Sequence, residues 1–282
     1  DLGKKTAVDS KAVPSFGNPV KDVEKMSDDE KADGRRDTDA NWGKKTYRGT
    51  RKDGSAWEKT TKWFGYKLHL LVDSIYELPL AFTVETASSS DMNNVLPLVD
   101  DLQAHHPAIH AGCEELSADK GYDSTNNNTV LYDEHSIKPV IDKRTMWKGE
   151  KTELFNPKLA DCIIYDEHGV VSCVCPATGE MRDMAFMGFE KDRASLKYRC
   201  PAVAGGYTCA GREECDRLSD GQPKTYGRVL RVPLEQDRRI FTPIARPTAK
   251  WQKAYNFRTS VERVNSRIDC VLGFELHTIR GK

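Results

Sequence analysis

Three acidic residues of this sequence, Asp9, Asp119 and Glu262, are candidates for joint chemistry. Phosphoryl transfer commonly uses two hard divalent cations, whose carboxylate ligands come from several elements of a fold. Asp9 lies within a predicted strand, Asp119 lies at the C-terminal end of another, where open α/β sheets place their ligands, and Glu262 lies on a predicted helix. The carboxylates meet if the two strands are neighbours and the helix lies across them. Each one alone could equally be an ordinary turn or surface residue.

Residues 251–272 are predicted to form the helix that positions Glu262. Apolar residues recur there at alternating spacings of three and four, which gives one buried stripe. That stripe consists of Ala254, Phe257, Val261, Val264, Ile268 and Val271. One position along runs a polar stripe of Tyr255, Arg258, Glu262, Asn265 and Asp269. A carboxylate next to an Arg and a Tyr suits metal or phosphate binding, although a solvated helix face is the alternative.

The remaining elements predict a mixed α/β protein. Strand patterns occupy residues 5–13, 63–73, 78–86, 113–120 and 137–142, and helical patterns follow at about 95–102, 126–135 and 251–272. Consecutive strands followed by alternating strands and helices imply a mixed sheet with helices packed on its faces. Residues 18–60 show almost no apolar periodicity, so we expect a long loop there with a basic second half.

The domain organisation follows from where this pattern breaks. Residues 1–143 and 246–282 are predicted to form one core, and residues 144–245 are predicted to be a β-rich, cysteine-containing insertion before the last helix. The first residue is Asp1 and a strand follows almost at once, so we expect that a further N-terminal region precedes this sequence.

Charge is segregated along the chain, although its total is balanced. The 282 residues contain 43 Lys and Arg and 43 Asp and Glu, which argues against nonspecific nucleic-acid binding by the molecule as a whole. Residues 44–67 nevertheless carry eight basic residues against two acidic ones, and residues 238–267 carry eight against one. Because Trp57 and Trp63 interleave with the first basic run, it resembles a surface that follows a nucleic-acid strand; a solvated loop is the alternative.

No apolar run approaches the length of a membrane span, and no secretory signal opens the sequence. We therefore expect a cytoplasmic protein with no membrane partner, whose eight cysteines are reduced thiols or metal ligands. Four thiolates suffice for a structural Zn²⁺ site, and ordinary free thiols are the alternative because no Cys-x-x-Cys pair is present. The preferred zinc ligands are Cys175, Cys200, Cys209 and Cys215, with Cys173 as the alternate.

Two motifs carry a resemblance to a known family. Residues 118–124, ADKGYDS, resemble the second-Asp motif of bacterial insertion-sequence transposases of the DDE class. Tyr255-x2-Arg258-x3-Glu262 resembles the Tyr-Arg-Glu signature around their third acidic residue, and AVDSKAV resembles the strand that carries the first Asp. The likeness spans about residues 6–272 outside the insertion. The chain departs from the pattern at Asp269, where the family often has Lys or Arg.

The resemblance implies an RNase H-like fold and metal-dependent DNA transposition. Asp9, Asp119 and Glu262 would bind two Mg²⁺ or Mn²⁺ ions and would catalyse strand cleavage and strand transfer at insertion-sequence ends. The implied partners are DNA, as transposon terminal repeats and target, and further copies of the chain in a homodimer or larger assembly. The implied location is the bacterial cytoplasm, at the nucleoid, and the expected N-terminal region would bind DNA.

The same resemblance, together with the basic runs, predicts the residues that contact DNA. These are Tyr255, Arg258, Lys120, Arg263, Arg267, Lys44, Lys45 and Arg51. Two other functions stay open: an RNase H-like nuclease without strand transfer, and a non-catalytic DNA-binding remnant of a transposase. Three candidate metal-binding carboxylates argue against the remnant, because a binding module has no need of them.

Overall fold

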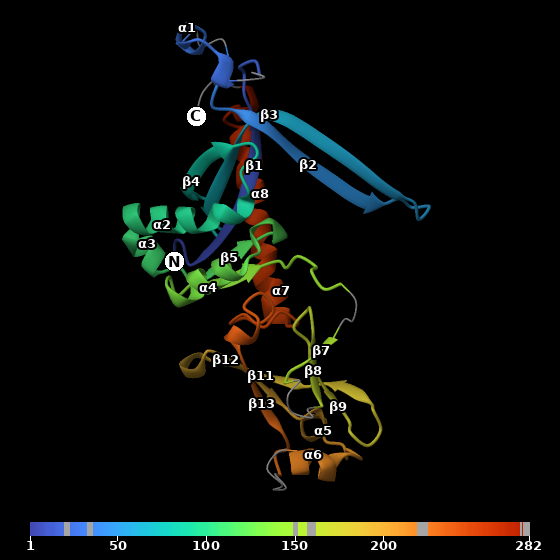
Figure 1. The fold of residues 1–282 in the computed structure, drawn as a ribbon. Helices are drawn as coiled ribbons and strands as arrows, with labels where there is room; N and C mark the ends of the chain where they lie inside the picture. The colour runs from blue at the N-terminus through green and yellow to red at the C-terminus, as the bar shows by residue number, and fades with distance from the viewer. Residues whose placement is uncertain are drawn as a thin grey trace. The chain divides into compact units, whose positions relative to one another are not determined.

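The chain forms two compact units in the computed structural model (Figure 1). Unit 1 comprises Asp1–Tyr122 and Phe257–Lys282, and unit 2 comprises Asp123–Asn256. The units thus divide after residues 122 and 256, whereas the sequence-based boundaries lay after residues 143 and 245. The structure describes residues 1–19, 23–32, 36–148, 152–156, 162–218, 225–276 and 278. Parts of the predicted loop 18–60 and of the predicted insertion 144–245 lie outside these residues.

Unit 1 is built on a mixed sheet with helices beside it, which confirms the predicted mixed α/β class. Its strands are β1 (Lys5–Pro14), β2 (Asn41–Thr50), β3 (Ala56–Asp73), β4 (Pro79–Thr86) and β5 (Glu115–Ala118). They follow the order β2-β3-β1-β5, and β4 also pairs with β3. The pairing of β1 with β5 is parallel, whereas β3 runs antiparallel to its three partners. The helices are α1 (Asp28–Ala32), α2 (Val95–His105), α3 (Pro107–Ala111) and α8 (Thr259–Cys270).

Helix α8 covers one face of this sheet because its apolar side chains have a matching apolar face on the strands. Side chains alternate between the two faces along a strand, so Ala7 of β1 and Val72 of β3, which are paired, point to the same side. Val261 and Val264 of α8 are buried against them. Asp9 lies two residues after Ala7 and therefore belongs to the face that α8 covers.

Part of the loop predicted at residues 18–60 is instead a hairpin formed by β2 and the first half of β3. Residues 41–50 and 56–65 pair along their whole length and extend from the rest of the sheet (Figure 1). The side chains of β2 are almost all exposed, so neither face required an apolar alternation. A strand pattern is legible only where one face is buried, and its absence here was wrongly interpreted as a loop.

Unit 2 contains two small antiparallel sheets and several short helices. One sheet has the order β10-β9-β8-β7, and the other has the order β11-β12-β13. The first consists of β7 (Thr152–Leu154), β8 (Ile163–Asp166), β9 (Val171–Val174) and β10 (Met181–Asp183), and the second of β11 (Ala185–Glu190), β12 (Ser195–Arg199) and β13 (Val229–Pro233). The other elements are α4 (Thr125–Asp133), β6 (Lys138–Ile141), α5 (Pro201–Gly205), α6 (Arg212–Leu218) and α7 (Ala249–Tyr255). An apolar core that includes Ile163, Leu196, Val232 and Phe241 joins the two sheets.

The single helix predicted at residues 251–272 is wrong, because the chain forms α7 and α8 with a 3₁₀ turn, Asn256–Arg258, between them. Ala254 belongs to an apolar cluster of unit 2, whereas Val261 belongs to a cluster of unit 1. Val271 is 76% exposed and takes no part in the buried stripe. A pattern of threes and fours does not reveal that its two halves pack in different units.

No helix within the described ranges is both long and apolar enough to cross a membrane.

Candidate active site

The register of β1 and β5 makes Asp9 and Asp119 neighbours. The two strands are parallel and pair from Lys5 with Glu115 up to Val8 with Ala118. Asp9 follows Val8, and Asp119 follows Ala118. Both carboxylates therefore lie at the point where β5 ends. Residues at matching positions of parallel neighbours lie on the same face of a sheet. The structure thus brings together two of the three predicted catalytic residues.

The pKa of Asp9 is raised because this carboxylate is buried close to another carboxylate. Burial raises this pKa from 3.8 to about 6, and the negative charge of Asp119 adds to the increase. The Ser10 backbone N–H, which donates to Asp9 Oδ1 at 2.8 Å, opposes the increase, as do the charges of Lys45 and Arg258. Asp9 is therefore within electrostatic range of the hairpin and of the turn before α8, and a cation placed beside it would favour the ionised form.

Gly121 allows Asp119 and a further carboxylate, Asp91, to approach closely. The Gly121 N–H donates to Asp119 Oδ1 at 2.7 Å. A Cβ at this glycine would lie 2.7 Å from Asp119 Oδ1 and 3.1 Å from Asp91 Oδ2. Asp91 accepts a hydrogen bond from Lys67 Nζ at 2.9 Å. Asp91 is not among the residues predicted from the sequence, because its only signal there is its place after a run of serines that resembles a helix start.

Tyr122 and His69 form a neutral, buried pair beneath these carboxylates. The Tyr122 hydroxyl lies 3.2 Å from His69 Nδ1, and both side chains are fully buried. Burial and the charges of Asp91, Asp9 and Asp119 raise the pKa of Tyr122 well above 10. Burial lowers the pKa of His69 to about 4. Neither group is charged near neutral pH, so the pair supports the site without compensating its negative charge.

Glu262 is placed by α8 but is engaged by a neighbour on its own helix. Its Oε1 accepts a hydrogen bond from Arg258 Nη1 at 2.7 Å, and its side chain is 52% exposed. Among the residues that the structure describes, no three His, Cys, Asp or Glu side chains are gathered as ligands of one metal ion. The structure therefore pairs Asp9 with Asp119 and holds Glu262 on Arg258, whose charge also reaches Asp9.

A polar groove of about 630 Å³ lies beside these residues. The hairpin, β1 and α8 all contribute to it, and the described lining includes Glu262 and Asp91 but neither Asp9 nor Asp119. Its lining residues are Ser10, Lys11, Ala12, Lys44, Lys45, Tyr47, Trp63, Lys67, Asp91, Glu262, Asn265, Ser266, Asp269 and Cys270. Asp269, which departs from the family pattern, forms an ion pair with Lys11 of β1 and so attaches α8 to the sheet.

The predicted basic contacts separate into two groups. Lys44 and Lys45 line the groove, whereas Arg263 and Arg267 both donate to Glu77 in the turn between β3 and β4. Helical spacing already places neither arginine on the line of the helix that carries Glu262, but it does not reveal that both bind Glu77.

Three other predicted contacts lie elsewhere. Arg51 lies at the tip of the hairpin, where its Nη1 donates to Ser55 Oγ at 3.3 Å. Lys120 is exposed directly after Asp119. Tyr255 belongs to unit 2, and its ring stacks on Trp251 with centroids 4.9 Å apart.

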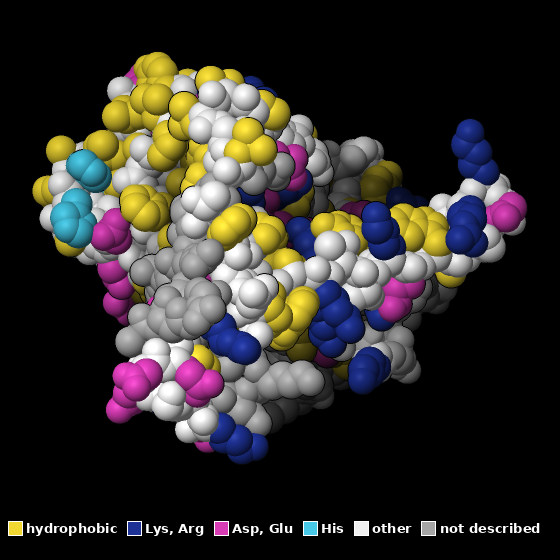
Figure 2. All heavy atoms as spheres, turned by 90° about the horizontal axis from the view of Figure 1, so that it is seen from above, with side chains coloured by type: hydrophobic (Ala, Val, Ile, Leu, Met, Phe, Trp, Pro, Cys, Tyr) yellow, Lys and Arg dark blue, Asp and Glu magenta, His cyan; other side chains and the backbone are white. Residues whose placement is uncertain are grey.

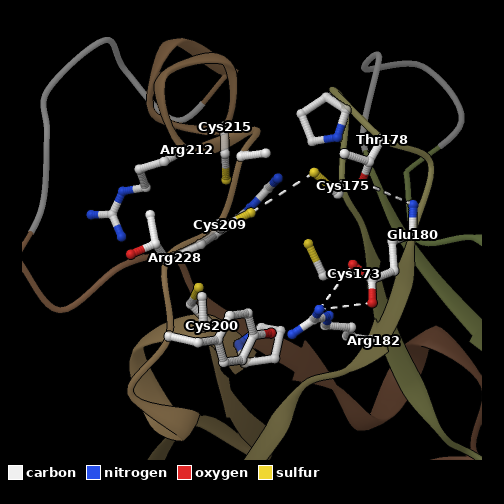
Figure 3. Close-up of a pocket in the computed structure, with 16 residues that line it drawn as sticks. Cys173, Cys175, Thr178, Glu180, Arg182, Cys200, Cys209, Arg212, Cys215 and Arg228 are labelled. Carbon is white, nitrogen blue, oxygen red and sulfur yellow. Dashed lines mark hydrogen bonds and ion pairs between the residues drawn. The ribbon is translucent and has the colours of Figure 1, made fainter.

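The cysteines proposed for zinc lie around one cavity of unit 2. Cys175, Cys200, Cys209 and Cys215 line it together with Cys173, and Figure 3 shows their sulfurs pointing into it from different segments. Cys162 is not among the cysteines selected from the sequence, but its thiol interacts with Cys173 and Cys215 at the edge of this cluster.

Comparison with known proteins gives one informative result. A family model described as "Transposase DDE domain" matches residues 3–281, which is nearly the whole chain. Neither the curated proteins nor the solved structures yield a match.

Proposed function

This chain belongs to the transposase DDE domain family, and we propose that it cleaves DNA strands and transfers them at insertion-sequence ends in a metal-dependent reaction. The family membership establishes a transposase in general and agrees with the resemblance in the sequence. One observation carries the finer proposal: the parallel register of β1 and β5 makes Asp9 and Asp119 adjacent carboxylates. We assign them, with Glu262, as the catalytic residues.

The donor set fits hard divalent ions. Asp9, Asp119 and Glu262 supply carboxylate oxygens, which Mg²⁺ and Mn²⁺ prefer, and Asp91 adds a fourth carboxylate nearby. Burial and the charge of Asp119 raise the pKa of Asp9, and a divalent cation bound beside this carboxylate would oppose both effects. Two ions bound there would activate the attacking water or 3′-hydroxyl and would stabilise the leaving oxygen.

Arg258 links the carboxylates to the DNA phosphate in this proposal. Its guanidinium binds Glu262, and its charge lowers the pKa of Asp9. A guanidinium has several donors in one plane, so it can bind a carboxylate and a phosphate oxygen together. Arg258 would hold the scissile phosphate against the carboxylates.

The hairpin provides the proposed path for the DNA backbone. Its register places Lys45, Tyr47, Lys59 and Trp57 on one face, and the Lys45 Nζ lies 5.7 Å from the centre of the Tyr47 ring. Figure 2 shows Lys and Arg side chains alternating with hydrophobic ones along this projecting arm. Basic groups that follow the backbone, together with rings on which bases stack, are the usual means of holding a nucleic-acid strand.

Small residues keep the aromatic groups of this face in place. A Cβ at Gly49 would lie 2.6 Å from Trp57 Nε1, and a Cβ at Gly43 would lie 2.5 Å from the Trp63 ring. Each indole therefore covers the glycine opposite it on β2. This cross-strand packing fixes the rings on an arm that has almost no buried core of its own.

The other predicted contacts complete the proposal. Lys120 and Arg51 are exposed, and Arg51 would exchange its hydrogen bond to Ser55 for a phosphate contact. Arg263 and Arg267 would first have to release Glu77. Because two transposon ends must be joined, we also propose a homodimer or larger assembly on DNA.

The decisive experiment measures Mg²⁺-dependent cleavage and joining on DNA that carries the segments flanking the coding region of this chain. Wild type should yield both products, and Glu262→Gln should yield neither. Glu134→Gln, which alters an exposed carboxylate at the end of α4, serves as the matched control and should behave as wild type. Equal activity of wild type and Glu262→Gln would refute the assignment of Glu262. Cleavage without joined products would replace strand transfer by nuclease activity.

A further inference from the structure

Five cysteines of unit 2 converge on one small cavity. The cavity has a volume of about 150 Å³, and the sulfurs that point into it come from separate segments (Figure 3). Cys173 lies on β9, Cys175 directly follows β9, Cys200 precedes α5, Cys209 precedes α6, and Cys215 lies on α6. Thiols that are distant in sequence but share one cavity form a soft donor set.

The spacing of two of these sulfurs fits a tetrahedral metal ion. The Sγ atoms of Cys175 and Cys209 are 3.9 Å apart. A Zn–S bond of about 2.3 Å and a tetrahedral angle require about 3.8 Å between two sulfur ligands. A disulfide would require about 2.0 Å. In the described part of the chain, no three potential ligands are already close enough together to bind one metal ion. Binding of zinc would therefore draw two further cysteine sulfurs toward Cys175 and Cys209.

Backbone and hydroxyl groups direct hydrogen bonds at the same two sulfurs. Hydrogen bonds from the Thr178 hydroxyl and from the amides of Thr178 and Ala177 lower the pKa of Cys175 to about 7. Burial raises the pKa of Cys209, and the Gly211 amide, which donates to its sulfur, opposes this increase. A Cβ at Gly211 would lie 2.9 Å from Cys175 Sγ, so glycine lets the loop before α6 close over that sulfur. Amides directed at sulfur stabilise the metal-binding thiolate.

The two remaining donors lie in segments that this loop also contacts. The Cys215 N–H donates to the Gly211 carbonyl at 3.0 Å, so α6 begins from the loop that carries Cys209. The Cys200 N–H donates to the Arg228 carbonyl at 2.8 Å at the start of α5. The charge of Cys200 is felt at Cys209, which places Cys200 near the pair.

We propose that Cys175, Cys200, Cys209 and Cys215 bind one structural Zn²⁺ ion, which ties the turn after β9 to the segments that begin α5 and α6. These short helices lie outside the apolar core of unit 2, which lies on its sheets. A cross-link by metal therefore stabilises the region that apolar burial stabilises least. The ion is structural because four thiolates leave no open position for a substrate.

The test is the metal content and the cobalt spectrum of the full chain, purified under reducing conditions. Wild type should contain about one zinc per chain, and after replacement by Co²⁺ it should show the thiolate-to-cobalt charge-transfer band of a four-sulfur site. Cys175→Ser and Cys209→Ser should each lose zinc and that band. A wild type with neither zinc nor the band, or with a Cys175–Cys209 disulfide, overturns the proposal.

Matched variants test the choice of ligands. The described residues that line the cavity do not include Cys162, so Cys162→Ser should retain zinc, as should Cys270→Ser in unit 1. Cys173→Ser should retain zinc, whereas Cys215→Ser should lose it. The opposite result for these two variants would refute the ligand set. None of these measurements depends on DNA cleavage, so this inference and the proposed function fail separately.

Discussion

The carboxylate site of unit 1 and the cysteine cavity of unit 2 are positioned by different means. Asp9 and Asp119 stand next to each other because paired strands fix their backbone positions. Cys175 and Cys209 approach each other through a turn and a loop that close over one another at Gly211. A hydrogen-bonded ladder holds its residues without a ligand, whereas loops usually need one to become rigid. The first site is thus preformed in its main pair, whereas the second would become rigid through the zinc ion that we propose it binds.

The largest expected effects come from exchanging one donor in each site. Asp119→Asn should reduce DNA cleavage by roughly 10²–10³-fold or more, because it removes a ligand of the metal ions that would stabilise transition-state charge, and it should leave the zinc content unchanged. Cys175→Ser should have the opposite effect: it should lose zinc and leave the Asp9–Asp119 pair intact. Cleavage rates and zinc content of both variants provide the measurement. Loss of zinc in Asp119→Asn would contradict the independence of the two sites.

Removal of the soft metal should be visible as a change in stability. If unit 2 depends on zinc, a zinc-selective chelator should lower one thermal transition by on the order of 10 °C, since about 1 kcal/mol corresponds to 4–8 °C in a domain of roughly 100 residues. Asp9→Asn should not alter the size of this shift, because its unit is held by the sheet. Calorimetry with and without chelator measures it. An unchanged transition would mean that the cysteine segments are already rigid without metal.

Two glycines test how closely each site is fitted. Gly121→Ala places a methyl group 2.7 Å from Asp119 Oδ1 and should reduce cleavage by about tenfold, as misplacement of a catalytic group does. Gly211→Ala places one 2.9 Å from Cys175 Sγ and should weaken zinc binding instead. Gly112→Ala is the control, because its new Cβ would make only ordinary contacts, the nearest at 3.5 Å. An active Gly121→Ala protein would show that Asp119 tolerates displacement.

The pKa of Asp9 predicts a dependence of stability on pH. Its folded value of about 6 exceeds the reference value of 3.8, so the folded state binds the proton more tightly. The resulting stabilisation is complete below about pH 4 and is lost as pH rises through 6. Asp9→Asn cannot ionise, so without divalent ions it should be more stable than wild type at pH 7, by about 1–3 kcal/mol. Urea unfolding at pH 4 and pH 7 measures the difference, and equal pH profiles would contradict the prediction.

Divalent ions should offset the loss of stability that the ionised Asp9 carboxylate causes at neutral pH. A cation beside this carboxylate lowers its pKa, so added Mg²⁺ should stabilise wild type more at pH 7 than at pH 5. Asp9→Asn should show a smaller difference between the two pH values. This comparison separates a carboxylate that binds metal from one that is merely buried.

The parts of the fold and of the candidate site that could be predicted from the sequence are those that depend on a local pattern or a local motif. Asp9 and Asp119 could be selected because each lies at a recognisable place on a strand, and the structure made them neighbours. The break between α7 and α8 could not be predicted, because both halves keep the same apolar spacing. Asp91 could not be selected either, since its approach to Asp119 depends on tertiary packing around Gly121.

The hairpin and the contact of Cys162 with the cysteine cluster escaped prediction for related reasons. The exposed side chains of β2 left no alternation to detect, although the strand pairs over its whole length. The contact of Cys162 depends on the pairing of β8 with β9, which joins Ile163 to Cys173 and so brings the thiol of the preceding Cys162 to Cys173. In both cases the informative contact joins residues of different strands and leaves no periodic signal along the chain.

The smallest expected effect concerns single basic residues, and it distinguishes the groove from the rest of the surface. Lys45 lines the groove and its charge reaches Asp9, whereas Arg267 is engaged by Glu77. Lys45→Ala should weaken binding of transposon-end DNA a few-fold and should reduce the slope of log affinity against log salt by about 1, because one phosphate contact is lost. Arg267→Ala should change neither quantity as long as Arg267 stays on Glu77. Binding titrations at several salt concentrations measure both variants. If Arg267→Ala reduced the slope and Lys45→Ala did not, the DNA would follow the Glu77 side of α8, and the hairpin would lose its proposed role.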